Sequence, residues 1–504
     1  MPSRMELQFT LPKSAAMPRR RNDAQCPRIL VMADFSGRAG RTSAAAPDFT
    51  QRAPRAVTVD TLDATMAQLQ PQLRLTLAAG LECAIRFHQL DDFHPDALYQ
   101  RLELFQTLRR IRTLLLDPAH FAQAMAELTP SVNAEPVHSE PPAQENDTAL
   151  LDRLLGRAPA TPTPTQATGV GATALQQWLR AIVEPHIVHT DPRQKSWVAA
   201  VDAALSEQMR SILHQPAFQA LEASWRGLQS LVANLEEDNA RIFLLDVTQQ
   251  ELLLDLRAAH GNPTTTSLYT LLIERGVTLA DGQPWTLWVG DYDFGAEPED
   301  LALLTTLGAL AAEAGGPFLA AAKPALLGCD TAAALADPAR WTPLPSTSQS
   351  HWQALRRGAV APWLGLALPR VLLRLPYGPK TDAVEAFAFE EMPGGRDPAA
   401  YLWGNPAFIC ARLIAAAFAE QGWDFVPGTV LELEDCPTHI YEEAGERALQ
   451  PATEALLGER ALQALLAGGL MPLLGHRQRN ALRLARFQSL AEPPAALAGM
   501  WAAD

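Results

Sequence analysis

Two acidic residues, Asp291 and Asp293, are the strongest candidates for chemistry in this sequence. They follow the apolar segment 285–290 (WTLWVG), which is typical of a buried parallel strand. Paired acids at the carboxyl end of such a strand can hold a divalent metal and a phosphate. An Asp-x-Asp motif is short and common, however. The favoured interpretation is that the two acids cap a turn before the next helix.

The other candidate motifs are incomplete. Segment 186–191 holds two histidines and an aspartate, but no further ligand is placed to close a metal site. The glycine pair in 37–40 lacks the Gly-Lys-Ser/Thr of a phosphate loop. Glu390 and Glu391 are adjacent and would point apart on a strand. With no nucleophile elbow and no catalytic cysteine signature, we expect no enzymatic activity, no metal and no cofactor.

Composition narrows the class of protein. The chain of 504 residues is long enough for two or three domains, and 48% hydrophobic against 19% charged residues is typical of globular proteins. A formal charge of −15 disfavours non-specific binding to nucleic acid or anionic membrane, although Arg19–Arg21 form a local basic cluster. No apolar run reaches the roughly 18 residues of a membrane span, and no signal peptide is recognisable. We expect a cytoplasmic protein without membrane insertion.

The five cysteines are far apart in the sequence and show no paired spacing, which argues against a zinc site or a disulfide framework. They are expected to be small buried hydrophobic residues.

The first region, 1–128, is predicted to begin with a detached strand. Its apolar residues alternate with polar ones, the period of a half-buried strand; they are Met5, Leu7, Phe9 and Leu11. A buried strand at 28–38, a hairpin at 73–87 about Ala79-Gly80 and a helix from Pro95 to Leu115 follow. A detached alternating strand has unpaired backbone groups, so we expect this arm to add to a sheet edge of a neighbouring subunit.

Residues 129–174 are rich in Pro, Ala, Thr and Glu and are predicted to be a linker. One island, 148–157, carries four leucines at helical spacing: Leu150, Leu151, Leu154 and Leu155. Such a helix either docks on its own domain or is recognised in the groove of a partner. The residues alone leave both alternatives open.

The second region, 175–504, is predicted to be α/β with a mixed sheet. Apolar stripes predict helices at 198–214 and 216–235, followed by the buried strand 241–247. Strands then alternate with helices: helix 248–259 with its capping box, strand 285–290, helix 299–313 and strand 317–322. Further on we expect an apolar strand region at 366–376, a helix capped by Asn405-Pro406, and short strands around a helix at 452–467.

Long collinear segments resemble the contractile sheath of type VI secretion systems. The first region resembles its small subunit, in 28–38 (RILVMADFSGR) and 91–128. The second region resembles its large subunit, in 191–232, 285–295 (WTLWVGDYDFG), 363–378, 389–393, 401–408 (YLWGNPAF), 469–474 and 486–490. Segments of this length are far more specific than a short motif. In the family the two subunits are normally separate chains. Here the regions that resemble them lie in one chain, joined by the linker.

The resemblance implies a structural assembly protein rather than an enzyme, with Asp291 and Asp293 in a segment carried for structural reasons. It implies partners: other sheath subunits, inner-tube hexamers, a baseplate and a recycling unfoldase ATPase that recognises the linker leucines. It also implies contraction without a cofactor, driven by relaxation of a metastable lattice. The N-terminal arm would pair with strands of neighbouring subunits.

One departure from the family keeps alternatives open. The sequence stops soon after RFQSL (486–490), whereas large sheath subunits usually continue into an extension that supplies lattice strands. A non-propagating homologue, such as a terminator, adaptor or baseplate-associated factor, is therefore the alternative. We expect short or unstable polymers from the protein alone unless a partner supplies strands. A metal-dependent enzyme using Asp291 and Asp293 is a remote alternative.

Overall fold

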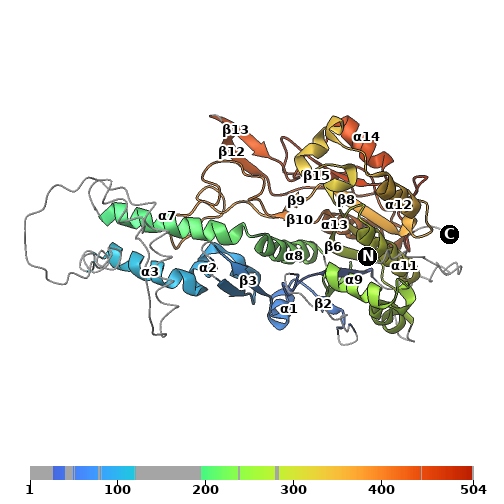
Figure 1. Cartoon of the computed structure of the whole chain (residues 1–504), viewed down its shortest axis with the longest axis horizontal. Helices are drawn as coiled ribbons and strands as arrows, with labels where there is room; N and C mark the ends of the chain where they lie inside the picture. Colours follow the sequence, from blue (N-terminus) through green and yellow to red (C-terminus); the bar gives the residue numbers. More distant parts are fainter. Residues whose placement is uncertain are drawn as a thin grey trace, which may run out of the picture. The chain divides into compact units, whose positions relative to one another are not determined.

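The computed structural model describes residues 26–39, 49, 52–77, 80, 82–117, 120, 194–235, 239–278, 283–443 and 445–501. The chain divides into two compact units. The larger comprises Met1–Leu98 with Met209–Asp504, and the smaller comprises Tyr99–Gln208. All the sheets of the described residues belong to the larger unit (Figure 1).

A nine-stranded sheet forms the centre of the larger unit. Its strands, in spatial order, are β11 (Glu432–Leu433), β15 (Leu482–Leu484), β14 (Met471–Gly475), β8 (Leu364–Leu368), β7 (Phe318–Ala322), β6 (Leu287–Phe294), β1 (Arg28–Ala33), β5 (Arg241–Asp246) and β2 (Arg55–Val57). The six strands from β14 to β5 are parallel, and β2, β15 and β11 add antiparallel edges. The predicted α/β fold with a mixed sheet is confirmed.

Strand β1 joins the two sequence regions in one sheet. It pairs along its whole length with β5, from Arg28 opposite Arg241 to Ala33 opposite Asp246, and on its other side with β6. Five of its six residues are buried, as expected for a parallel strand covered on both faces. The region 1–128 thus contributes a central strand, and the antiparallel edge β2, to a sheet whose other strands come from 175–504.

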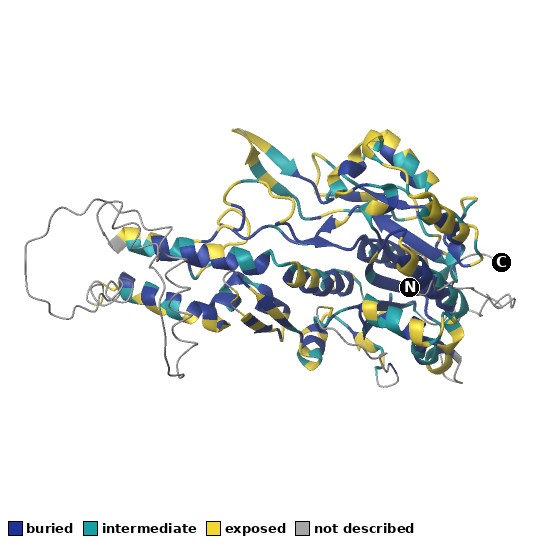
Figure 2. Cartoon of the chain, viewed as in Figure 1, coloured by how far each residue is buried: buried dark blue, intermediate teal, exposed yellow. Residues whose placement is uncertain are grey.

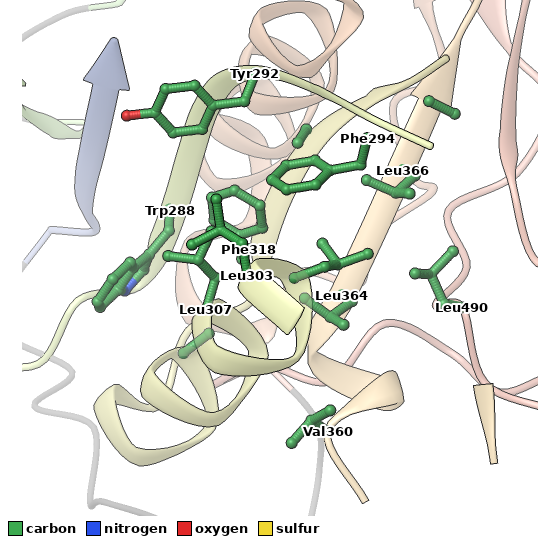
Figure 3. Packing of buried hydrophobic residues seen from close by; sticks show 14 of the residues in the cluster. Trp288, Tyr292, Phe294, Leu303, Leu307, Phe318, Val360, Leu364, Leu366 and Leu490 are labelled. Atoms are coloured by element: carbon green, nitrogen blue, oxygen red, sulfur yellow. The ribbon is translucent and has the colours of Figure 1, made fainter. Parts of the chain in front are cut away.

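Helices of the larger unit, among them α11 and α13, pack on the sheet. The described helices of both units have the bounds α1 Leu62–Leu69, α2 Pro95–Arg101, α3 Glu103–Leu116, α7 Gln194–Leu213, α8 Pro216–Val232, α9 Gln249–Ala258, α10 Ser267–Tyr269 continued by a π-helix Thr270–Thr278, α11 Pro298–Ala314, α12 Ser346–Arg356, α13 Pro406–Gln421 and α14 Glu459–Ala467. Trp288, Phe294 and Phe318 point from the strands into the core against α11 (Figure 3). Because side chains alternate along a strand, Asp291 and Asp293 lie on the opposite face of β6.

Several predicted elements are confirmed. The hairpin is formed by β3 (Gln72–Thr76) and β4 (Glu82–Arg86), with Gly80 at φ +73° in the turn. Helix α9 begins with the predicted capping box: Thr248 accepts from Glu251 N–H, and Glu251 accepts from Thr248 N–H. Asn405 caps α13 by accepting from Ala407 N–H.

Two predicted helices have different bounds. The helix from Pro95 to Leu115 is interrupted at Leu102, whose extended backbone (φ −79°, ψ 130°) separates α2 from α3. The buried residues continue across the break, so the apolar period did not reveal it. Helix α14 starts at Glu459 instead of 452, because the preceding residues are not helical and Thr453 forms a bridge to Val371 of β9 (Val371–Leu372).

Two further two-stranded sheets complete the described strands. Strand β9 pairs with β10 (Trp403–Gly404), and β12 (His439–Glu443) pairs with β13 (Glu446–Gln450). Figure 2 shows the contrast between the buried central sheet and the hairpin β12–β13, whose residues are mostly exposed or half-buried. Within the described residues, no helix is long and apolar enough to cross a bilayer.

Candidate functional site

A cleft of about 320 Å³ lies in the larger unit near the carboxyl ends of β1, β5 and β6. Asp34 follows β1 directly, and Thr248 comes two residues after β5. The charged and amide or hydroxyl side chains of the lining include Asp34, Ser224, Asp291, Asp293, Arg370 and Asn405. Ligands of open α/β sheets bind at such carboxyl ends. The position therefore makes this cleft the first place to look for chemistry.

Asp291 is the most perturbed acid of the cleft. Its pKa is raised to about 6: burial is the largest cause and the charges of Asp293 and Asp34 add to it, while hydrogen bonds from Ser224 and Asn405 oppose the shift. Ser224 Oγ lies 2.6 Å from Asp291 Oδ2 and 3.0 Å from the Ala220 carbonyl oxygen. The Ser224 hydroxyl thus donates to Asp291 and links this acid to helix α8.

The predicted turn-capping role of Asp291 and Asp293 is wrong. Strand β6 continues to Phe294, so both acids lie inside it. The turn before α11 is instead held by Asp300, which accepts from Gly295 N–H at 2.7 Å and pairs with Lys323. In the part of the chain that the structure describes, no group of three His, Cys, Asp or Glu side chains could hold a metal.

A charged network joins the first sequence region to the second beside this cleft. Arg38 pairs with Asp246 and Glu251, and Arg52 donates to both oxygens of Glu251 at 2.9 and 2.7 Å. Burial by itself raises the pKa of Glu251, but hydrogen bonds from Arg52 and Thr248 N–H, with the charge of Arg38, lower it to about 2. Glu251 is thus both a helix cap and the acceptor of two arginines from the other region.

Aromatic contacts extend the junction along α8. Trp225 Nε1 donates to the Phe35 carbonyl at 2.9 Å, and the two rings meet edge to face with centroids 5.0 Å apart. Phe218 makes similar edge contacts with Phe87 and Phe93, at 5.9 and 5.5 Å. All five side chains are buried. The first region is therefore attached to the second by backbone pairing, charge and aromatic packing together.

A second charged cluster is buried between α8 and residues 374–391. Arg374 donates to Glu222 and to Glu391, each at 2.8 Å, and neither carboxylate side chain has exposed surface. Tyr377 N–H also donates to Glu391. Burial acts to raise the pKa of Glu391, but the charge of Arg374 and hydrogen bonds from His214, Arg374 and Tyr377 N–H lower it to about 2. Glu391 is buried and Glu390 exposed, so the two do point apart, although not on a strand.

Some predicted sites lie outside the described residues, so the structure does not test them. These are the arm residues Met5, Leu7, Phe9 and Leu11, the linker leucines and the histidines of 186–191. Four cysteines are buried, as predicted, and Cys26 is half-buried. The sequence did not single out Asp34, Arg38 or Arg374. Asp34 directly follows an apolar run, as Asp291 does. The expectation that acids at the carboxyl ends of buried parallel strands form a site therefore includes Asp34 once β1 is known to lie beside β6.

Comparison with protein families finds two matches along the chain. Residues 195–491 match the family described as EvpB/VC_A0108, tail sheath N-terminal domain, and residues 20–134 match the family described as type VI secretion system, VipA, VC_A0107 or Hcp2. The type VI secretion system sheath protein TssC1 of Pseudomonas aeruginosa is 34% identical over 306 residues. The aligned residues cover 59% of this chain and 61% of that protein, so the chain spans about three fifths of the relative's length.

Proposed function

Because the chain belongs to the tail sheath family of type VI secretion systems and carries both sheath regions, we propose that it works as a one-chain sheath subunit. Copies of it assemble around an inner tube, and contraction of the assembly propels that tube. The observation that carries the proposal is the central position of β1. A strand of the small-subunit-like region lies between β5 and β6 of the large-subunit-like region, so the two regions share one sheet.

A subunit whose two regions are firmly joined suits a sheath that contracts by changing the packing between its subunits. Lattice contraction needs subunits that keep their own structure while contacts between them change. The continuous pairing of β1, the network around Glu251 and the ring contacts of Trp225 supply that rigidity at the junction. Fusion also holds the two regions at one copy each, where separate subunits depend on their mutual affinity.

The partners follow from this role. We propose inner-tube hexamers, a baseplate and a recycling unfoldase ATPase in addition to other sheath subunits, with a cytoplasmic site of action in bacteria. The ATPase would recognise Leu150, Leu151, Leu154 and Leu155 in a groove. Replacing Leu151 and Leu154 by Asp is expected to weaken ATPase binding in a titration without lowering Tm. Lower Tm with unchanged binding would instead indicate intramolecular docking.

The proposal includes no catalysis and no cofactor. Asp291→Asn combined with Asp293→Asn is expected to leave assembly and secretion at the wild-type level, since neither acid belongs to a metal-binding group of the described residues. A variant that folds and assembles but no longer supports secretion would contradict this part of the proposal.

Electron microscopy of the purified chain, alone and with its tube protein and baseplate components, tests the proposal as a whole. Tubes with a regular helical lattice that enclose the inner tube are the expected result in the complete mixture. Discrete particles bound to one end of a tube would instead favour a terminator, adaptor or baseplate-associated role. Particles that never associate with tube or baseplate would reject both.

A further inference from the structure

The tip of the hairpin β12–β13 places two acids directly opposite each other. Glu443 of β12 pairs in register with Glu446 of β13, and both residues are exposed. Like charges that face each other across a strand pair destabilise that pair. The next pair along the ladder is balanced, because Glu442 stands opposite Arg447 and lies 4.0 Å from Lys380. Glu443 and Glu446, here called the acidic tip, form no ion pair among the described residues.

The same hairpin leaves an apolar side chain in water. Ile440 is 66% exposed, more than any other large hydrophobic residue of the described chain, and it stands opposite Leu449. The hairpin projects from the body of the larger unit in Figure 1. Interfaces between proteins commonly combine an apolar contact with a charged rim. An exposed aliphatic residue on the same hairpin as an acidic pair is typical of such an interface.

An arginine-rich segment lies at the opposite end of this hairpin. Residues 475–486 (GHRQRNALRLAR) run from the end of β14 through β15 and contain no acid. Thr438, directly before β12, donates to the Asn480 side chain at 2.7 Å, and Cys436 N–H donates to the Asn480 carbonyl at 2.8 Å. These contacts place the segment at the base of the hairpin. Its four exposed arginines, here called the arginine turn, are Arg477, Arg479, Arg483 and Arg486.

Neighbouring acids neutralise only part of the arginine turn. Arg479 lies 2.8 Å from Glu432 and 3.1 Å from Glu434. Asp435 is the third acid at this end of the hairpin. The other three arginines of the turn form no ion pair within the described residues, although Arg483 stands opposite Glu432 where β15 pairs with β11. Their charges are available to an anionic partner.

The hairpin holds its acidic tip away from the arginine turn of the same copy. Its ladder is unbroken from His439, next to the turn, to Glu443 at the tip. Four steps along a strand measure roughly 13 Å. In the part of the chain that the structure describes, no ion pair joins the tip to the turn. Two copies placed tip to base would bring these opposite charges together.

Other surfaces of a second copy are less suited to receive the tip. Helix α3 also carries several arginines, but Arg109 donates to the carbonyls of Tyr99 and Gln100. Arg112 of the same helix pairs with Asp202. An incoming acid would compete with these contacts. The formal charge of −15 makes much of the remaining surface repulsive to an acid. The arginine turn is therefore the favoured acceptor.

We propose that the acidic tip of one copy of this chain docks on the arginine turn of a second copy. The inference rests on the proposed function in that copies must associate, and it names a contact through which they do so. The two faces of the contact are different. Each copy can therefore offer its tip to one neighbour and its turn to another.

Charge reversal in the full-length chain tests the contact by sedimentation at about 0.1 M ionic strength, where the Debye length is about 10 Å. The tip variant is Glu443→Arg with Glu446→Arg, and the turn variant is Arg477→Glu with Arg486→Glu. Each should raise the dissociation constant for self-association by roughly tenfold or more, because attraction becomes repulsion. The tip variant still has like charges opposite each other, so the hairpin itself is matched to the wild type.

Two control variants change the net charge equally at exposed residues elsewhere. Asp60→Arg with Asp330→Arg matches the tip variant, and Arg340→Glu with Arg460→Glu matches the turn variant. Both controls should associate like the wild type. Their wild-type behaviour would show that the position of the charges, rather than the net charge of the chain, decides association.

A neutral tip separates the contact from folding. Glu443→Gln with Glu446→Gln removes the like-charge pair, so Tm should stay at the wild-type level or rise. Association should nevertheless weaken, because the attraction to the arginine turn is lost. A lower Tm together with weaker association would contradict the contact, since it would show that the two acids act through the fold.

Combining the two reversals in one chain gives the sharpest readout. The combined variant has a basic tip and an acidic turn, so the two faces are complementary again with their signs exchanged. We expect it to associate roughly tenfold more tightly than either single reversal. Association as weak as in the single reversals would overturn the contact.

The outcomes separate this inference from the proposed function. Wild-type association of the tip variant or of the turn variant would overturn the contact and leave self-assembly intact. A wild-type chain that stays monomeric in sedimentation would also overturn it. The proposed function fails only if tubes are absent as well from the complete mixture with tube protein and baseplate components.

Discussion

Two clusters of acids meet helix α8 only two residues apart, and the pKa values of their acids are shifted in opposite directions. Glu222 of α8 shares Arg374 with Glu391, whereas Ser224 of α8 meets Asp291 in the cleft. Burial raises the pKa of Glu391 and of Asp291 alike. The arginine then lowers the pKa of Glu391 to about 2, while Asp291, beside a hydroxyl and other acids, stays near 6. The partner, rather than the depth of burial, decides whether a buried acid carries its charge.

The difference in pKa is also a difference in stability: the charged forms of Glu391 and Glu251 stabilise the fold, and the charged form of Asp291 destabilises it. The Arg374 cluster ties α8 to residues 374–391, and the Glu251 network ties the first region to the second. Asp291, in contrast, contacts the uncharged side chains of Ser224 and Asn405, and it lowers stability when it ionises. A perturbed acid in a cleft is a common mark of an active site. Here the perturbation comes from burial under helix α8 and from the neighbouring acids Asp293 and Asp34.

Removing the shared arginine should have the largest effect. Arg374→Met leaves Glu391 buried without its arginine and leaves Glu222 with Arg226 alone, and we expect a loss of about 3–5 kcal/mol in the free energy of unfolding. Urea unfolding measures it. Arg357→Met is the control, because that arginine is 61% exposed and pairs with Glu492 at the surface, where a pair contributes about 0–1 kcal/mol. Equal losses in the two variants would contradict the role of the buried cluster.

Neutralising Glu251 should have an intermediate effect that depends on pH. Glu251→Gln removes the charged acceptor of Arg38 and Arg52, at a cost of about 2–3 kcal/mol near neutral pH. Because the pKa of Glu251 is lowered to about 2, its stabilisation is complete above the unfolded value of 4.5 and is lost as pH falls towards 2. The difference between variant and wild type should therefore shrink at pH 3.

The exposed pair of Glu299 and Arg257 provides the control for that experiment. Glu299→Gln should change the free energy of unfolding by less than about 1 kcal/mol at either pH. A Glu251→Gln variant that behaves like Glu299→Gln would show that the junction does not depend on its ion pairs.

Asp291→Asn should give the smallest effect, and in the opposite direction. The raised pKa means that wild-type stability is highest below the unfolded value of 3.8 and falls as pH rises through about 6. The amide carries no charge, so we expect a gain of about 1–2 kcal/mol at pH 7.5 and none at pH 3.5. Tm measured at both values tests this. A loss of stability at pH 7.5 would show that the charge of Asp291 is needed.

Local patterns predicted much of the fold. The continuous apolar run of β1, the alternation of the β3–β4 hairpin and the stripes of α7 and α8 each carry one period, and each element formed as expected. The π-helix Thr270–Thr278 and helix α12 were not predicted. No element predicted from the sequence covers either segment.

The charged clusters were beyond prediction for a different reason. Glu222, Arg374 and Glu391 come from segments up to about 170 residues apart, so no spacing in the sequence links them. Asp291 was found, but as the end of a strand, because Asp and Asn usually terminate strands. Its place inside β6 depends on pairing with β7, where Asp293 lies opposite Ala321.

The central claim is that the two sheath-like regions fold as one body around β1. A protease site inserted into the linker 129–174 tests it directly, by cutting the purified full-length chain and passing the product through size-exclusion chromatography without denaturant. We predict that both fragments elute together at the size of the uncut chain, since β1 stays between β5 and β6. Two fragments that elute separately, each folded, would contradict the claim.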